Sequence, residues 1–165
     1  MFITFLQMGL ANGVQPLLGY NFGSGDRERF QKIAAYTRKC CVIIGVLATL
    51  LFFVFRRPII GLFIQDEEVI YYGVKMLIAY MLSGPGIGIL FMNMNCMQSV
   101  GKAFWATLLS VLRQGLLLIP LLFILNALGG LNGVIYGQAL TDYIAVFLSA
   151  VLWRKCKTYN SARKS

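Results

Sequence analysis

Apolar residues occur along this chain in long runs, separated by short charged, polar or glycine-rich segments. A helix needs about 20 mostly apolar residues to cross the roughly 30 Å hydrocarbon core of a bilayer. The runs predict helical spans at residues 1–22, 34–55, 69–100, 103–125 and 134–153, and a polar tail that frays at 154–165. We therefore expect an all-α fold, a polytopic transmembrane helix bundle of about five spans.

Proline and glycine lie inside two of the predicted spans. Pro16 falls within the first apolar run, and Ser83-Gly84-Pro85-Gly86-Ile87-Gly88 falls in the middle of the third. A proline removes a helical hydrogen bond and kinks or breaks the helix. Non-helical backbone inside a membrane is tolerated only against protein or a water-filled cavity. We expect Pro16, Gly84, Pro85 and Gly86 to bend or interrupt their helices and to act as hinges.

Charged residues mark the ends of the second predicted span. Asp26 is expected to cap its first helical turn. The stretch Phe30–Lys39 mixes charged and apolar residues at helical spacing, which predicts an amphipathic segment lying at the membrane surface. The apolar part that follows is short, so Arg38 and Lys39 are expected to snorkel to the interface. Arg56-Arg57-Pro58 is expected to close the span.

The connections between the later spans are short. The acidic cluster of Asp66, Glu67 and Glu68 predicts a helix start, because carboxylates favour the positive end of the helix dipole. Gly101-Lys102 predicts a tight turn, and the glycine- and asparagine-rich residues 126–133 predict a short loop. Successive spans are therefore expected to be antiparallel neighbours.

Composition agrees with a membrane protein. Of the 165 residues, 58% are hydrophobic and 13% are charged, whereas about a quarter of the residues in soluble domains are charged. The net charge of +9 does not indicate a nucleic-acid partner, because the basic residues adjoin apolar spans and form no separate basic face. The lipid bilayer is the expected surrounding.

Lysine and arginine are distributed unequally between the two sides of the predicted bundle. One side carries eleven: Arg27, Arg29, Lys32, Arg38, Lys39, Lys102, Arg154, Lys155, Lys157, Arg163 and Lys164. The other side carries Arg56, Arg57 and Lys75. Cytoplasmic loops are enriched in Lys and Arg. The pattern predicts a multi-pass protein of the cell membrane with its C-terminus in the cytoplasm.

The side chains needed for most enzyme or metal chemistry are missing. The chain has no histidine, and its four cysteines, Cys40, Cys41, Cys96 and Cys156, form no Cys-x-x-Cys pair. This argues against a zinc or haem site and removes the commonest general base. We expect no enzyme activity, no metal site and no cofactor.

Arg113 and Asp142 are the ionisable residues deepest in the predicted spans. Each lies about ten residues from one end of its span, so both reach a similar depth of roughly 15 Å. An isolated charge there costs at least about 2.5–3.5 kcal/mol, and pairing reduces this cost. The pair is expected to meet near the midplane. Two interpretations remain open: a proton, cation or substrate site, or a structural ion pair that joins two helices.

Three polar side chains, Asn93, Asn95 and Gln98, follow the glycine-proline segment of the third span. Asn93 and Asn95 are two positions apart on a helix and therefore face different directions. We expect one to line a cavity and the other to bond a neighbouring helix. Polar groups beside a broken helix are typical of transporter sites, although hydrogen bonding between helices alone also explains them.

Several segments together resemble one known family. Gln15-Pro16-Leu17-Leu18-Gly19-Tyr20-Asn21 and the following Phe22-Gly23-Ser24-Gly25-Asp26 are similar to the cytoplasmic end of a helix in the multidrug and toxin extrusion (MATE) family, in the form of its second lobe. Phe63–Val69 resembles the family's external connector, and Gln98–Lys102 its cytoplasmic turn. Leu112-Arg113-Gln114 with Ile119-Pro120-Leu121 resembles its penultimate helix.

The resemblance implies the partial second lobe, helices eight to twelve, of a twelve-helix pseudo-twofold antiporter. Such proteins export cationic or amphipathic organic compounds in exchange for Na⁺ or H⁺, and the missing N-terminal lobe would be a partner of this chain. Some members carry an acidic cation-binding residue in the tenth helix, where this chain has Asn93 and Asn95. Coupling would then depend on Asp142 or on the missing lobe.

Two other functions remain open at this point. A lipid-linked saccharide flippase of related fold would need a more cationic cavity than Arg113 alone offers. A truncated, non-transporting membrane fragment is the alternative from a different class. An open reading frame that continues upstream of Met1 through further apolar spans would favour the antiporter over the fragment.

Overall fold

The computed structural model describes residues 2–61 and 67–162, and all of its regular structure is helical within these ranges. The elements are α1 (Phe2–Gly23), α2 (Arg27–Gly61), α3 (Glu67–Ser99), α4 (Ala103–Val111), the π-helical segment η1 (Leu112–Leu116) and α5 (Leu118–Ala162). The predicted all-α fold is confirmed. Of the acidic cluster, Asp66 lies outside the described residues, and α3 begins at Glu67.

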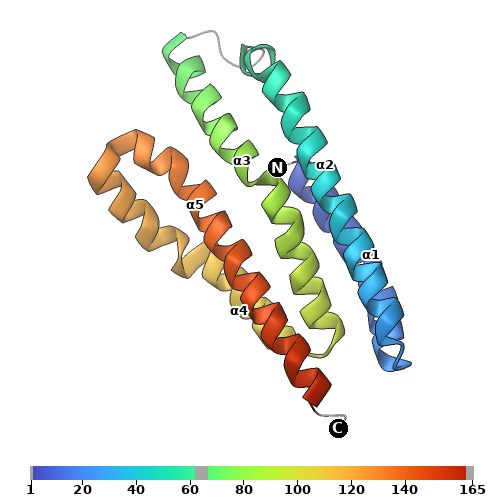
Figure 1. Ribbon diagram of the computed structural model, residues 1–165. Helices are drawn as coiled ribbons and strands as arrows, with labels where there is room; N and C mark the ends of the chain where they lie inside the picture. Colours follow the sequence, from blue (N-terminus) through green and yellow to red (C-terminus); the bar gives the residue numbers. More distant parts are fainter. Residues whose placement is uncertain (1, 62–66, 163–165) are drawn as a thin grey trace.

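Helix α3 is the centre of the bundle. It lies between α2 and α5 and also packs against α1 and α4 (Figure 1). Its residues contribute to two buried apolar clusters, one shared with α4 and α5 and the other shared with α1 and α2. The first cluster contains Leu90, Met97, Ala106, Leu109, Ala145 and Cys156, and the second contains Leu18, Phe30, Ala34, Met92 and Cys96.

Four helical stretches of the described chain are long and apolar enough to cross a membrane. They are Arg27–Phe55, Ile70–Ser99, Ala103–Gly130 and Asn132–Cys156. The predicted first span forms a helix of 22 residues, α1, but it is not among these four. Its polar residues, which include Gln7, Asn12 and Gln15, lower its hydropathy. That α1 is a fifth span stays a prediction.

Both short turns follow their predicted chemistry. Asp26 caps α2, since its Oδ1 accepts a hydrogen bond of 2.9 Å from the backbone N–H of Arg29. Gly25 before it has φ 81°, and Gly101, between α3 and α4, has φ 77°. Such positive φ angles favour glycine, which has no Cβ to clash with the backbone. The tight turns at Asp26 and at Gly101-Lys102 are confirmed.

The predicted loop at residues 126–133 is wrong in its extent. Helical structure continues on both sides, and the chain reverses at Gly130 alone, which has φ 54° and ψ −137°. The two limbs of α5 then pack closely, because a Cβ at Gly133 would collide with the carbonyl oxygen of Leu125 and one at Gly137 would lie 2.8 Å from Leu122 Cδ2. Because Gly133 and Gly137 have no side chains, the two limbs can pack closely enough for the chain to reverse at Gly130 without a longer loop.

Several predicted helix ends and breaks are also wrong. Helix α2 is continuous from Arg27 to Gly61, so Phe30–Lys39 is not a separate segment but the first part of a longer helix that packs against α1 and α3. That it lies at the level of the membrane surface stays a prediction. The helix also continues past Arg56-Arg57-Pro58, whereas the stretch that is apolar enough to cross a membrane ends at Phe55. Helix α5 continues to Ala162, so most of the predicted frayed tail is helical. Tertiary packing in the bundle outweighs these local signals.

The predicted interruptions at proline do not occur. Helix α1 continues through Pro16, and α3 continues through Gly84, Pro85 and Gly86. A helix can tolerate proline in a membrane when neighbouring side chains satisfy the backbone groups that proline leaves free. A hinge function at these residues stays a prediction.

Candidate functional site

The ion pair that the sequence predicts is formed. Arg113 Nε donates a hydrogen bond of 2.7 Å to Asp142 Oδ1, joining η1 to the second limb of α5. Asp142 is 0% exposed and Arg113 is 9% exposed. Because both groups are deeply buried, each charge stabilises the other, and removal of either would leave an unpaired charge inside the protein.

A π-helical turn carries Arg113. The N–H of Leu117 donates to the carbonyl of Leu112 at 2.8 Å, a bond across five residues. Pro120 has no N–H, so a carbonyl of the turn before it lacks its usual helical donor. The backbone nevertheless stays helical through Leu117, and the π-turn accommodates one extra residue in the helix. Such π-turns are frequent at functional sites.

Asp142 is not fully satisfied by Arg113. Its second oxygen, Oδ2, is buried and has no hydrogen-bond partner among the described residues. The guanidinium of Arg113 also lies over the ring of Phe91 on α3, 5.9 Å from its centroid. A buried carboxylate oxygen without a hydrogen-bond partner has capacity for one more ligand, such as a proton or a small cation.

Asn93 and Asn95 face different helices, as predicted. Asn93 lies between α2 and α5. Its Oδ1 accepts a hydrogen bond of 2.9 Å from Arg38 Nη2, and its Nδ2 donates a hydrogen bond of 3.0 Å to Ser149 Oγ. Asn95 faces α1 and donates 3.1 Å to Asn12 Oδ1. Both side chains are buried. The structure thus gives both residues partners on neighbouring helices, and a cavity-lining role for one of them stays a prediction.

Gln98 also joins α3 to α1. Its Oε1 accepts a hydrogen bond of 3.0 Å from Gln15 Nε2. One position further, Ser99 Oγ donates 3.3 Å to the backbone carbonyl of Gln15. The last turn of α3 is therefore fastened to α1 just before Pro16.

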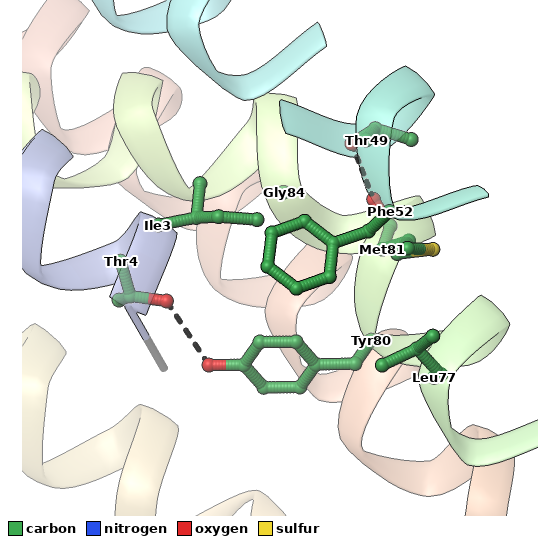
Figure 2. A pocket seen from close by; sticks show the side chains of 8 residues that line it. All are labelled: Ile3, Thr4, Thr49, Phe52, Leu77, Tyr80, Met81 and Gly84. Carbon is green, nitrogen blue, oxygen red and sulfur yellow. Dashed lines mark hydrogen bonds between the residues drawn. The ribbon is translucent and has the colours of Figure 1, made fainter. Parts of the chain in front are cut away.

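Pro85 explains a bond between α3 and α2. Without an N–H at Pro85, the carbonyl of Met81, four residues earlier, lacks its usual helical donor. Thr49 Oγ1 donates to that carbonyl at 3.2 Å, as the dashed line in Figure 2 marks. A side chain of α2 thus replaces the missing backbone group.

Two more carbonyls next to Pro85 accept side-chain donors from other helices. Tyr143 Oη on α5 donates 2.7 Å to the carbonyl of Leu82. Gln7 Nε2 on α1 donates 3.1 Å to the carbonyl of Gly84. With Thr49, three helices bind the same turn of α3. This carbonyl cluster (Met81, Leu82 and Gly84) was not predicted, because nothing local in the sequence pairs it with its donors.

Gln7 sits where α1, α2 and α3 come closest. It is fully buried, and its Nε2 also donates 2.9 Å to the carbonyl of Cys41 on α2. Glycines make room for it: a Cβ at Gly45 would lie 2.7 Å from Gln7 Nε2, and a Cβ at Gly88 would lie 2.8 Å from Cys41 Cβ. The hydrogen bonds of Gln7 therefore require that α2 and α3 approach closely at Gly45 and Gly88.

A small hollow of about 130 Å³ lies beside this turn, between α1, α2 and α3. It is mainly apolar, and a hydrogen bond of 3.0 Å between Thr4 Oγ1 and Tyr80 Oη crosses its edge (Figure 2). Its lining comprises Ile3, Thr4, Thr49, Phe52, Leu77, Tyr80, Met81 and Gly84. The predicted hinge residue Gly84 therefore borders both a cavity and the carbonyl cluster.

Thr49→Val is expected to destabilise the bundle by about 1–3 kcal/mol, because the Met81 carbonyl then loses its donor inside an apolar site. Valine keeps the shape of threonine, so packing is preserved. In a Pro85→Ala background the alanine supplies a backbone N–H to the same carbonyl, and the cost should fall close to zero. Unfolding of the purified protein in detergent measures both values. An equal cost in the two backgrounds would contradict the link between Thr49 and Pro85.

The comparisons with known proteins agree on one family. The MatE family model matches residues 1–124. The chain belongs to the MatE family. Multidrug export protein MepA of Staphylococcus saprophyticus is 34% identical over 153 residues, which cover 92% of this chain and 33% of that protein. MepA of Staphylococcus aureus strain MRSA252 is also 34% identical over 153 residues, with the same coverage of both chains.

Solved structures of the family have the same fold. An inward-facing multidrug resistance MATE family transporter of the MOP superfamily matches with a TM-score of 0.88 at 18% identity, over 99% of this chain and 39% of the other. A crystal structure of MATE in complex with MaL6 matches with a TM-score of 0.85 at 17% identity. The chain spans about one third of the length of the curated relatives it matches. These MatE relatives are transporters and not enzymes.

Among the described residues, no group of three or more His, Cys, Asp or Glu side chains could hold a metal ion. The polar residues that the sequence singled out instead form two sets, the Arg113–Asp142 pair and the bonds of α3 to its neighbours. Arg38 belongs to the second set and was missed as a candidate. Its position at the edge of an apolar run predicts only that it snorkels to the interface, and nothing local in the sequence indicates its hydrogen bond to Asn93 on α3.

Proposed function

We propose that this chain forms part of a secondary active antiporter that exports drug-like or toxic organic compounds in exchange for Na⁺ or H⁺. Its similarity to proteins named for multidrug export supports the substrate class. The observation that carries the coupling is Asp142, a fully buried carboxylate with one oxygen bound to Arg113 and the other without a partner among the described residues. No cofactor beyond the coupling ion is needed.

The Arg113–Asp142 pair offers a simple exchange mechanism. A proton or Na⁺ that binds Oδ2 weakens the attraction of Asp142 for Arg113 by compensating the same negative charge. Arg113 lies on η1 and Asp142 on α5, so a weaker pair loosens the contact of these elements. Alternating access requires two arrangements of the helices, each favoured by one ligation state of the site.

Orientation and surroundings complete the proposal. The chain is a multi-pass protein of the cell membrane, and the excess of Lys and Arg at one end of the bundle supports a cytoplasmic C-terminus. The remaining lobe of the transporter faces it and supplies the other half of the substrate pathway. The flippase alternative is less well supported, because the Arg113 charge is already neutralised by Asp142.

Asp142→Asn in the full-length transporter is expected to reduce ion-coupled dye efflux at least tenfold, because the amide cannot exchange a proton and binds a cation weakly. Efflux of a fluorescent organic cation from proteoliposomes under an imposed Na⁺ or H⁺ gradient measures this. Asp26→Asn is the matched control, since asparagine caps a helix as well as aspartate does. Normal efflux by Asp142→Asn at normal expression would remove Asp142 from the coupling mechanism.

A further inference from the structure

A second cation of the bundle, Arg38, has no carboxylate partner in the described structure. In contrast, Lys32 pairs with Glu28, and Arg113 pairs with Asp142. Arg38 Nη2 donates to the neutral amide of Asn93 at 2.9 Å, and its Nε is buried without a hydrogen-bond partner. A guanidinium has five N–H donors, and leaving a buried one unpaired costs free energy. Arg38 therefore has both charge and donors available for an anionic ligand.

Two hollows meet at Arg38, and both are also lined by Ala35. The first, of about 170 Å³, lies at the basic end of the bundle and includes Gln31 and Trp153. The second, of about 420 Å³, is lined otherwise by Lys39, Val42, Ile43 and Ile89. The two sites follow one face of α2, since residues 31, 35, 38 and 42 recur at helical spacing. A compact polar site thus continues into an apolar one.

The surroundings place the first hollow at the level of lipid headgroups. Trp153 stacks on Phe30 across it, with ring centroids 6.1 Å apart and planes at 29°. Tryptophan is enriched at membrane–water interfaces. Beyond Cys40 the helix is apolar up to Phe55. An elongated ligand with an anionic head at Arg38 and an apolar body along Val42 and Ile89 would fit this order of sites.

We propose that Arg38 holds the headgroup phosphate of an anionic phospholipid, one acyl chain of which lies in the hollow lined by Val42 and Ile89. Arginine matches phosphate oxygens with paired N–H donors and is weakly hydrated, so it suits this role better than lysine. Lys39 adds a second positive charge beside the apolar hollow. Basic sites between membrane helices bind anionic headgroups in this way.

Native mass spectrometry of the full-length transporter, released from mixed micelles of phosphatidylglycerol and phosphatidylcholine, tests the proposal. The wild type is expected to retain phosphatidylglycerol preferentially. Arg38→Gln should lower that retention about fivefold, because the headgroup phosphate loses its charged hydrogen-bond donor. Arg29→Gln, an exposed arginine of the same helix that lines neither hollow, is the matched control and should leave retention unchanged.

Ala35→Trp keeps the proposal testable if loss of Arg38 disturbs folding. Ala35 is exposed and borders both hollows, so the indole should block the lipid without removing charge. Equal retention of the two lipids by the wild type, or unchanged retention in both Arg38→Gln and Ala35→Trp, would overturn the proposal. Displacement of the lipid by millimolar inorganic phosphate would show that the site binds free anions, and this result would also overturn the proposal. If the wild-type transporter retained no lipid at all, because another of its segments covers Arg38, the proposal would also be contradicted.

Discussion

Arg113→Met is expected to destabilise the bundle by about 3–5 kcal/mol, because it leaves the Asp142 carboxylate buried beside no cation. Both side chains are almost fully buried and share a bond of 2.7 Å, so solvent does little to screen the loss. Thermal or denaturant unfolding in detergent measures the effect. Arg29→Met is the control, since it removes the same charge from an exposed site and should change stability by less than about 0.5 kcal/mol.

The double variant Arg113→Met with Asp142→Leu separates structure from function. Replacing both members of a buried pair by apolar residues is often neutral or stabilising, so most of the lost stability should return. Ion-coupled efflux should not return, because the exchangeable carboxylate is gone. A stable double variant with normal efflux would mean that the pair only joins η1 to α5. A double variant as unstable as Arg113→Met would contradict the pairing as the source of the loss.

Gly45→Ala is expected to cost about 3 kcal/mol, at the upper end of the range for overpacking. The added Cβ would lie 2.7 Å from Gln7 Nε2 and 2.9 Å from Pro85 Cα. The backbone at Pro85 cannot rotate away as a side chain can, so α2 and α3 must separate and Gln7 must give up its bonds. The same unfolding assay measures the loss.

Gly9→Ala on α1 is the matched control for Gly45→Ala. No atom lies within 4 Å of a Cβ at Gly9, and replacing a helical glycine by alanine there should be neutral or stabilising by up to about 1 kcal/mol. Equal effects at the two positions would show that helix propensity, and not the contact between α2 and α3, decides the result.

The Arg113–Asp142 pair could be predicted because the reasoning needed only two consecutive antiparallel helices and the depth of each residue in them. The opposite directions of Asn93 and Asn95 followed in the same way from helical periodicity. Hydropathy, residue spacing and charge are local properties of the sequence. They predict the helices, the directions of their side chains and the contacts between consecutive helices.

The bonds around Pro85 could not be predicted, because they depend on contacts between distant parts of the chain. The proline signalled a break, but Thr49, 32 residues before Met81, supplies a donor that keeps the helix continuous. The hydrogen bond of Arg38 could not be predicted for a similar reason, since its partner Asn93 lies 55 residues away. At Gly130 the loop was overestimated because close packing of the two limbs of α5 is invisible in a run of glycine and asparagine.

The central position of α3 also sets the order in which the chain becomes stable during synthesis. On α1, Gln7 and Gln15 bond partners on α3 that lie 77 and 83 residues later in the chain. At about 5–20 residues per second, a ribosome delivers those partners roughly 4–17 seconds after the two glutamines. Until then Gln15 lacks its partner on α3, and Gln7 has only its bond to the carbonyl of Cys41 on α2. A chain that ends before Gln98 should therefore leave Gln15 on α1 without its partner on α3.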